Sequence, residues 1–296
     1  MLKRAARRIG QLVTISALVF LAWALYQQRA DMSDWTPTAA QIALVFALTL
    51  AYTAALVLLA LNWATIVQTL VPQSPPRAPL LLSYTKTQIA KYVPGNVVHL
   101  VSRHMYLKNF GLDHRPLATA SLLELVSLPL AAIIAMCLTI TFTDGASAGV
   151  WALGAFAPLA LFAAVGIATL AIYPARPSWR RPAVTVLTRG VAFMVCQGAI
   201  FAVVLYTVSG SFVALAIPAA IFAWLVGFLT PGSPGGIAVR EALLINLLAH
   251  LSATDDVLIA ALLLRVITAF GDLVLYLFGN LIVEKFVPGT HSNRSS

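Results

Sequence analysis

Long apolar runs separated by short polar connections make up most of this chain. The clearest runs lie at about 11–27, 39–61, 116–142, 149–173, 189–209, 211–230 and 256–284. A helix needs about 20 apolar residues to cross the hydrocarbon core of a membrane, because the core is about 30 Å thick and a helix rises about 1.5 Å per residue. The pattern therefore predicts an all-α polytopic membrane protein with about 6–8 membrane segments.

Two stretches depart from this pattern because they combine apolar residues with charges and helix breakers. The stretch 79–113 contains Pro94-Gly95 and several basic residues, and 231–251 opens on Pro231-Gly232-Ser233-Pro234-Gly235-Gly236. Proline removes a backbone donor and glycine weakens a helix, so we expect a break in each stretch. They are either surface loops or re-entrant segments, in which irregular backbone at membrane depth faces protein or a water-filled cavity.

The two broken stretches resemble each other. A shift of 137 positions, with a later gap of four residues, superimposes these residues: Pro94-Gly95 on Pro231-Gly232, Arg103 on Arg240, and Glu124 on Arg265. The matched residues are uncommon in membrane segments. We therefore expect one transmembrane domain, 1–296, built from half repeats at about 1–142 and 149–285, each with three spans and one re-entrant hairpin.

Charges in the short connections predict the orientation of the chain. The first ten residues and the 174–189 connection are basic without acids, whereas the turns at 143–148 and 252–256 carry only acids. By the positive-inside rule, the basic connections and both termini are cytoplasmic in an inner (plasma) membrane. The two halves then have opposite topology, a plan that recurs in secondary transporters with a site near the bilayer midplane. A full span at 211–230 would contradict this inversion.

Composition supports the membrane interpretation and excludes several functions. Of 296 residues, 60% are hydrophobic and 10% are charged, whereas soluble domains carry about a quarter charged residues. The net charge of +9 fits basic cytoplasmic connections. The chain has no nucleic-acid motif, no phosphate loop, no zinc motif and no Ser/His/Asp arrangement. We therefore predict a protein that is not an enzyme, with no cofactor, no metal, no catalytic residue and no nucleic-acid partner.

The arginines that follow the two breaks are the strongest candidates for chemistry. An ionisable side chain in the hydrocarbon core costs several kcal/mol unless it is paired or hydrated. Arg103 and Arg240 each lie in the early turns of a new helical run, where the helix N-terminus favours anions and the guanidinium fork suits phosphate. Glu124, Arg265 and Asp272 either pair to hold helices together or shape a cavity beside that site.

Two motifs are similar to the signature segments of a known family. Lys91-Tyr92-Val93-Pro94-Gly95-Asn96 with Arg103, and Pro234-Gly235-Gly236-Ile237-Ala238-Val239-Arg240-Glu241, resemble those of the lysylphosphatidylglycerol synthase transmembrane-domain family of flippase-like proteins. The resemblance implies a membrane domain of the kind that moves aminoacylated phosphatidylglycerol between leaflets. Some stand-alone members are associated with glycolipid or polysaccharide pathways.

The chain departs from that family in two respects. The full synthase carries a soluble catalytic domain after the membrane region, whereas this sequence stops at Ser296, so we expect that it does not make the aminoacyl lipid. Ala238 also stands where the family commonly has glycine.

The sequence thus predicts a protein that binds and flips an anionic phospholipid or a polyprenyl-phosphate-linked lipid. The predicted substrate-binding residues are Arg103, Arg240, Pro94, Gly95, Asn96, Gly235, Gly236, Glu241, Glu124 and Arg265. Membrane lipids, and a glycosyltransferase or lipid synthase, are the expected partners. One alternative is a non-transporting partner subunit of a lipid or polysaccharide pathway. The other is a membrane glycosyltransferase that uses surface acids such as Asp255-Asp256.

Overall fold

The computed structural model describes residues 36–71, 73–92, 98–108, 110–141, 143, 177–230, 236, 238–281 and 283–286. Within these ranges every regular element is a helix, which confirms the all-α prediction. The runs expected at 11–27 and 149–173 lie outside the described residues, as do Pro94, Gly95, Asn96 and Gly235.

Four described helices are long and apolar enough to cross a membrane. They are α2 (Ala39–Leu70), α5 (His114–Ile140), α7 (Arg180–Ser209) and α10 (Thr254–Leu281). These helices confirm the runs at 39–61, 116–142, 189–209 and 256–284 and indicate a membrane-embedded protein.

Two of the long helices extend beyond the apolar runs that predicted them. α2 continues to Leu70 and α7 begins at Arg180, because polar side chains in the added turns bond between the two helices. Asn62 Nδ2 donates to the backbone oxygen of Val186 at 2.9 Å, and Arg189 Nη1 donates to Thr65 Oγ1 at 3.1 Å. A buried hydrogen-bonded polar group is compatible with a packed helix, although it lowers the local hydropathy.

Local signals fix several helix ends. At the start of α2, Thr38 Oγ1 accepts from the backbone N–H of Gln41, and Gln41 Oε1 accepts from that of Thr38, forming a capping box. α7 ends at Gly210, whose φ of 73° favours glycine. α10 carries Asp255 and Asp256 in its first turn, where carboxylates interact favourably with the helix dipole.

The two irregular stretches form short helices. The first has α3 (Arg77–Thr87), the 3-10 helix η2 (Gln88–Tyr92) and α4 (Val98–Lys108). The second has α9 (Val239–Leu248), and α8 (Ala216–Leu229) precedes it within the apolar run 211–230. α8 contains 14 residues and is therefore about 21 Å long, shorter than the hydrocarbon core. The apolar run 211–230 does not form a spanning helix.

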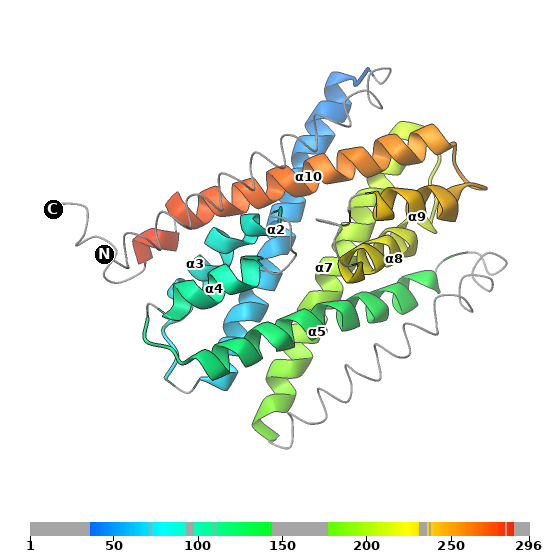
Figure 1. Cartoon of the computed structure of the whole chain (residues 1–296). Coiled ribbons are helices and arrows are strands. Elements are labelled where there is room, and N and C mark those ends of the chain that lie inside the picture. The colour runs from blue at the N-terminus through cyan, green and yellow to red at the C-terminus, as the bar shows by residue number, and fades with distance from the viewer. Residues whose placement is uncertain are drawn as a thin grey trace.

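The long helices cross at the centre of the fold and carry the short helices between them (Figure 1). α2 and α7 pack against each other and run in opposite directions. α5 and α10 also run in opposite directions in this view. α3 packs between α2 and α10, whereas α8 packs between α7 and α5. The two short-helix pairs therefore lie on opposite sides of the α2–α7 pair.

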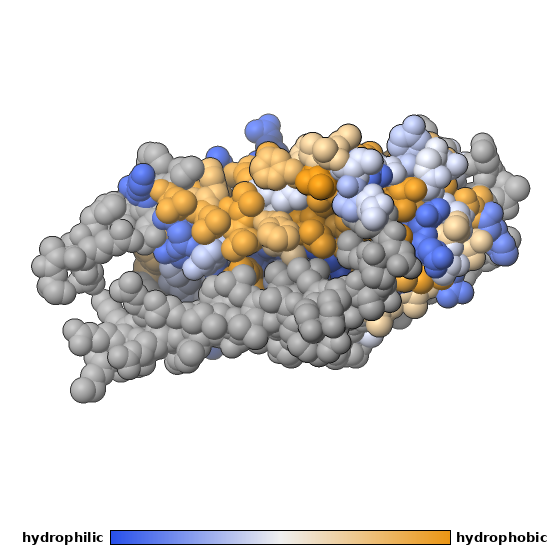
Figure 2. Space-filling view, turned by 90° about the horizontal axis from the view of Figure 1, so that it is seen from above, coloured by the Kyte–Doolittle hydropathy of each residue, from blue (hydrophilic) through white to orange (hydrophobic). Residues whose placement is uncertain are grey.

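Apolar side chains cover the outside while charged side chains lie inside. Figure 2 shows apolar residues across the middle of one face, with hydrophilic residues toward its ends. Large exposed hydrophobic residues occur on all four long helices, including Phe46, Leu122, Val184 and Phe270. Inside the fold, Arg103, Asp272 and Glu241 are buried. This distribution is typical of a protein whose solvent includes lipid.

Candidate functional site between the short helices and α10

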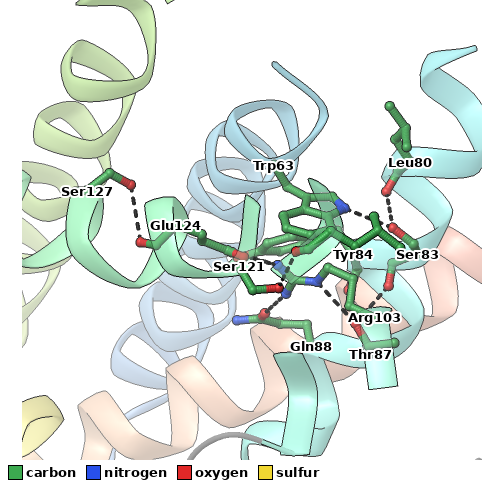
Figure 3. A network of polar contacts seen from close by, with 11 residues as sticks. Trp63, Leu80, Ser83, Tyr84, Thr87, Gln88, Arg103, Ser121, Glu124 and Ser127 are labelled. Carbon is green, nitrogen blue, oxygen red and sulfur yellow. Dashed lines mark hydrogen bonds and ion pairs between the residues drawn. The ribbon is translucent and has the colours of Figure 1, made fainter. Parts of the chain in front are cut away.

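Arg103 on α4 is fully buried and all three of its guanidinium nitrogens have partners (Figure 3). Nη1 pairs with both carboxylate oxygens of Glu124 on α5, with a distance of 2.6 Å to Oε1. Nε lies 3.4 Å from Thr87 Oγ1, and Nη2 lies 3.4 Å from Gln88 Oε1. The ion pair holds α4 against α5 and neutralises the buried guanidinium.

Aromatic rings complete the surroundings of Arg103. Its guanidinium carbon lies 4.0 Å from the centre of the Tyr84 ring and 4.8 Å from that of the Trp63 ring. Trp63 Nε1 in turn donates to Ser83 Oγ at 3.0 Å. A cation desolvated against aromatic faces is stabilised by about 2 kcal/mol or more. In this conformation each guanidinium nitrogen of Arg103 donates to a partner within the protein.

A second ion pair joins α9 to α10. Arg265 Nε on α10 pairs with Glu241 Oε1 on α9, with side chains that are 18% and 10% exposed. Glu241 therefore pairs with Arg265 rather than with its chain neighbour Arg240. The signs are reversed relative to the first pair, because the short helix α4 supplies the arginine of the first pair and the short helix α9 supplies the carboxylate of the second.

Arg240 differs from Arg103 because no carboxylate of the described residues pairs with it. Its guanidinium carbon lies 5.9 Å from the centre of the Trp224 ring on α8. Its Nε atom is buried without a hydrogen-bond partner, although the residue as a whole is partly exposed. The Arg240 side chain is therefore partly accessible from outside the protein, and its Nε–H group can still donate a hydrogen bond.

Two glycines make room for the Arg240 side chain. A Cβ atom built on Gly227 would lie 2.8 Å from Arg240 Cγ, and one on Gly236 would lie 2.5 Å from Arg240 Nε. Gly236 also has a φ of 74°, and Ala238 follows with a φ of 68°, a conformation that side chains rarely adopt. Glycine at these positions therefore has a steric reason, which supports including Gly236 in the site.

A third charged group links α10 to the first broken stretch. The Asp272 side chain is fully buried, and Lys91 Nζ lies 2.6 Å from its Oδ2. The hydroxyl of Tyr92 donates to the same oxygen at 2.5 Å. Lys91 and Tyr92 are in η2, immediately before the first break, so Asp272 anchors the end of that short helix.

Unsatisfied polar atoms gather on α9 and α10. Among the described residues, four buried atoms there have no hydrogen-bond partner: Arg240 Nε, Glu241 Oε2, Arg265 Nη2 and Asp272 Oδ1. Buried polar groups normally find partners, so such a concentration suggests a position that binds water or a ligand.

The sequence identified most of the charged residues but not how they are arranged. It placed Arg103, Arg240, Glu124, Glu241 and Arg265 together, whereas the structure divides them between two ion pairs and one arginine that has no carboxylate partner among the described residues. It did not predict the aromatic residues against the guanidinium groups, which are Trp63, Tyr84 and Trp224. Lys91 and Tyr92 belong to the first motif, but the sequence did not predict them as site residues.

A histidine pair joins His104 on α4, outside the four candidate spans, to His114, the first residue of α5. His104 Nε2 and His114 Nδ1 are 2.8 Å apart. Partial burial, together with His114 and Lys108, lowers the pKa of His104. A lowered pKa means that the folded state disfavours protonation, so this contribution to stability is complete above about pH 6.5 and decreases as the pH falls.

We expect the thermal midpoint of the detergent-solubilised protein to fall when the pH is lowered through about 6.5, and to fall less in a His104→Gln variant. Measuring the midpoint across the pH range with both proteins tests this. Identical pH profiles would show that the pair does not contribute.

Comparisons with known proteins found no matching family model, no similar curated protein and no similar solved structure. Among the described residues, no group of histidine, cysteine, aspartate and glutamate side chains is arranged to hold a metal ion.

Proposed function

We propose that this protein binds an anionic phospholipid or a polyprenyl-phosphate-linked lipid in the inner membrane and translocates it between leaflets, without acting as an enzyme. The observation that carries the proposal is Arg240, which is partly exposed, has no carboxylate partner among the described residues, and has a buried Nε atom without a hydrogen-bond partner among them. A guanidinium fork binds phosphate through charge-assisted hydrogen bonds, and a lipid head group is the anion that a membrane supplies.

The charges near α9, α10 and the first break include one basic group that could bind an anion. Among the basic side chains there are Lys91, Arg103, Arg240 and Arg265. Three of them pair with the carboxylates of Asp272, Glu124 and Glu241, respectively. Arg240 is thus the one basic group of this set without a carboxylate among the described residues. A single phosphate would compensate its charge.

The packing of the helices supports the proposed internal repeat. In the proposed repeat, the first half consists of α2, α3, α4 and α5, and the second half consists, in the same order, of α7, α8, α9 and α10. Each packing contact among these helices then has a counterpart in the other half. For example, α2 packs on α10 as α7 packs on α5, and α3 packs on α10 as α8 packs on α5. The opposite directions of α2 and α7 agree with an inverted topology (Figure 1).

Short helices joined at a break fit the proposed re-entrant segments. A full span at 211–230 would contradict an inverted topology. α8, the helix in this run, is too short to cross the hydrocarbon core and is therefore compatible with inversion. In transporters with inverted repeats, the substrate site lies at the repeat interface, formed by discontinuous helices. Arg240, next to the second break, occupies such a position in this proposal.

The two arginines have different roles in this proposal. Arg103 holds α4 against α5 through Glu124, and Arg240 contacts the lipid phosphate, with Gly236 close to it. The resemblance of both motifs to the flippase-like family agrees with a lipid substrate. The cytoplasmic position of both termini is part of the same proposal and follows from the charges of the connections.

The experiment is translocation of fluorescent phosphatidylglycerol by the purified full chain in phosphatidylcholine proteoliposomes. We expect Arg240→Gln to lower the rate about tenfold or more, because a hydrogen bond to a charged group contributes about 1.5–3 kcal/mol. Arg240→Lys retains the charge but loses the fork, so we expect an intermediate rate.

Arg181→Gln is the matched control, because it removes an exposed arginine from the first turn of α7. It should translocate lipid at the parental rate. If Arg240→Gln also does so while folded, the site assignment is wrong. If no variant moves lipid but the protein co-purifies with a lipid or polysaccharide synthase, it is a partner subunit.

A further inference from the structure

Asp272 is a buried carboxyl group that the proposed anion contact does not use. It lies within α10, a candidate span, and its side chain is fully buried. Its ion-pair partner Lys91 is 26% exposed, so the pair connects the interior to the surface of the protein. A carboxylate at such a position is costly and is often functional.

The two oxygens of Asp272 have different environments. Oδ2 receives both the Lys91 ammonium group and the Tyr92 hydroxyl, at 2.6 Å and 2.5 Å. Oδ1 is buried without a hydrogen-bond partner among the described residues. A carboxylate offers about four acceptor positions, so Oδ1 can take a proton while Oδ2 keeps its hydrogen bond from the Tyr92 hydroxyl.

Asp272 and Arg240 share neighbours. Both groups interact electrostatically with Tyr52 on α2 and with Tyr92 on η2. The titratable or charged groups around Asp272, Lys91 and Arg240 are Lys91 and Tyr92 on η2, Tyr52 on α2, Tyr84 on α3, His99 and Arg103 on α4, Glu124 on α5, Cys196 on α7, Arg240 and Glu241 on α9, and Arg265 on α10. Tyr52 and Tyr92 therefore lie near both the carboxyl group and Arg240.

We propose that Asp272 is a proton-binding site whose protonation releases Lys91 to pair with the lipid phosphate, so that a proton and an anion bind together. This inference rests on the proposed function and adds its coupling ion. One proton from water binds Oδ1, and the carboxylate becomes a neutral acid. The phosphate then replaces that carboxylate as the counterion of Lys91, and the total charge of the site is unchanged.

The coupling has a physical reason. With Asp272 neutral and no anion bound, the Lys91 ammonium group loses its counterion, and a partly buried charge without a partner is less stable than a paired one. With the anion bound and Asp272 ionised, phosphate and carboxylate repel each other near the same ammonium group. The two ligands therefore favour each other's binding, and by linkage the effect is reciprocal.

The test is an infrared pH titration of the purified full chain in detergent micelles. We expect an absorption band of a protonated carboxyl group that is missing in Asp272→Asn. Short-chain phosphatidylglycerol should raise the midpoint of that band by about one pH unit, which corresponds to about tenfold tighter lipid binding when Asp272 is protonated. In Lys91→Gln, the midpoint should no longer respond to the lipid.

Asp255→Asn is the control, because it removes an exposed carboxylate from the first turn of α10 and should leave the band unchanged. If Asp272→Asn does not fold, Asp272→Glu identifies the band by shifting its frequency. Absence of a band that depends on residue 272 overturns the proton site. If the midpoint of the band does not change when lipid is added, the coupling is wrong. The proposed function is tested separately, by the translocation assay with Arg240→Gln.

Discussion

Replacing Glu124 by glutamine is expected to lower the free energy of unfolding by about 3–5 kcal/mol, because it leaves a buried guanidinium without a counterion. Arg103 is fully buried, whereas the Glu124 side chain is 17% exposed. Glutamine preserves the size of the side chain, so the loss reports on charge rather than on packing. Equilibrium unfolding in mixed detergent micelles measures the effect.

The double variant Arg103→Met/Glu124→Leu separates the charge effect from other causes. Replacing both partners of a buried ion pair by apolar residues of similar volume is often neutral or stabilising. We therefore expect the double variant to be at least as stable as the wild type, or close to it. If Glu124→Gln alone is as stable as the wild type, the ion pair does not hold α4 against α5.

Glu241→Gln is the matched comparison at the ion pair between α9 and α10. The Arg265 and Glu241 side chains are 18% and 10% exposed, so water compensates part of the lost pairing and the destabilisation should be smaller than that of Glu124→Gln. Equal losses at the two ion pairs would show that burial does not decide the strength of these pairs.

Gly279→Ala is expected to destabilise the protein by about 1–3 kcal/mol, because it overpacks the contact between α10 and α3. A Cβ atom on Gly279 would lie 2.0 Å from Thr85 Oγ1 and 2.6 Å from Thr85 Cβ. Thr85 is itself 3% exposed, so its side chain cannot swing into solvent. The helices must separate, and the thermal midpoint in detergent should fall.

Two further variants make this result specific to the helix contact. Thr85→Gly/Gly279→Ala moves the small residue from one helix to the other and should regain part of the loss, although glycine within α3 costs about 1 kcal/mol. Leu277→Ala truncates an exposed side chain on the same helix and should change the midpoint little. A Gly279→Ala protein with the wild-type midpoint would contradict the close approach.

The sequence alone predicted the helical class and the four apolar runs that form long helices, whereas the two predicted breaks fall at residues outside the described ranges. Each of these features depends on neighbouring residues, because a span needs a continuous apolar run and a break needs local proline or glycine. The apolar runs did not predict the C-terminal end of α2 or the N-terminal end of α7. There, Asn62 and Arg189 lower the local hydropathy but bond across the helix interface.

The sequence also supplied the charged residues of the candidate site, but only the tertiary structure decided which of them pair. Arg103 and Arg240 look alike in sequence, since each follows a break, yet one is enclosed by Glu124 and aromatic rings and the other keeps a free donor. The contact between Tyr92 and Asp272 joins residues 180 positions apart. Such pairings depend on which helices pack together, and no local pattern encodes this.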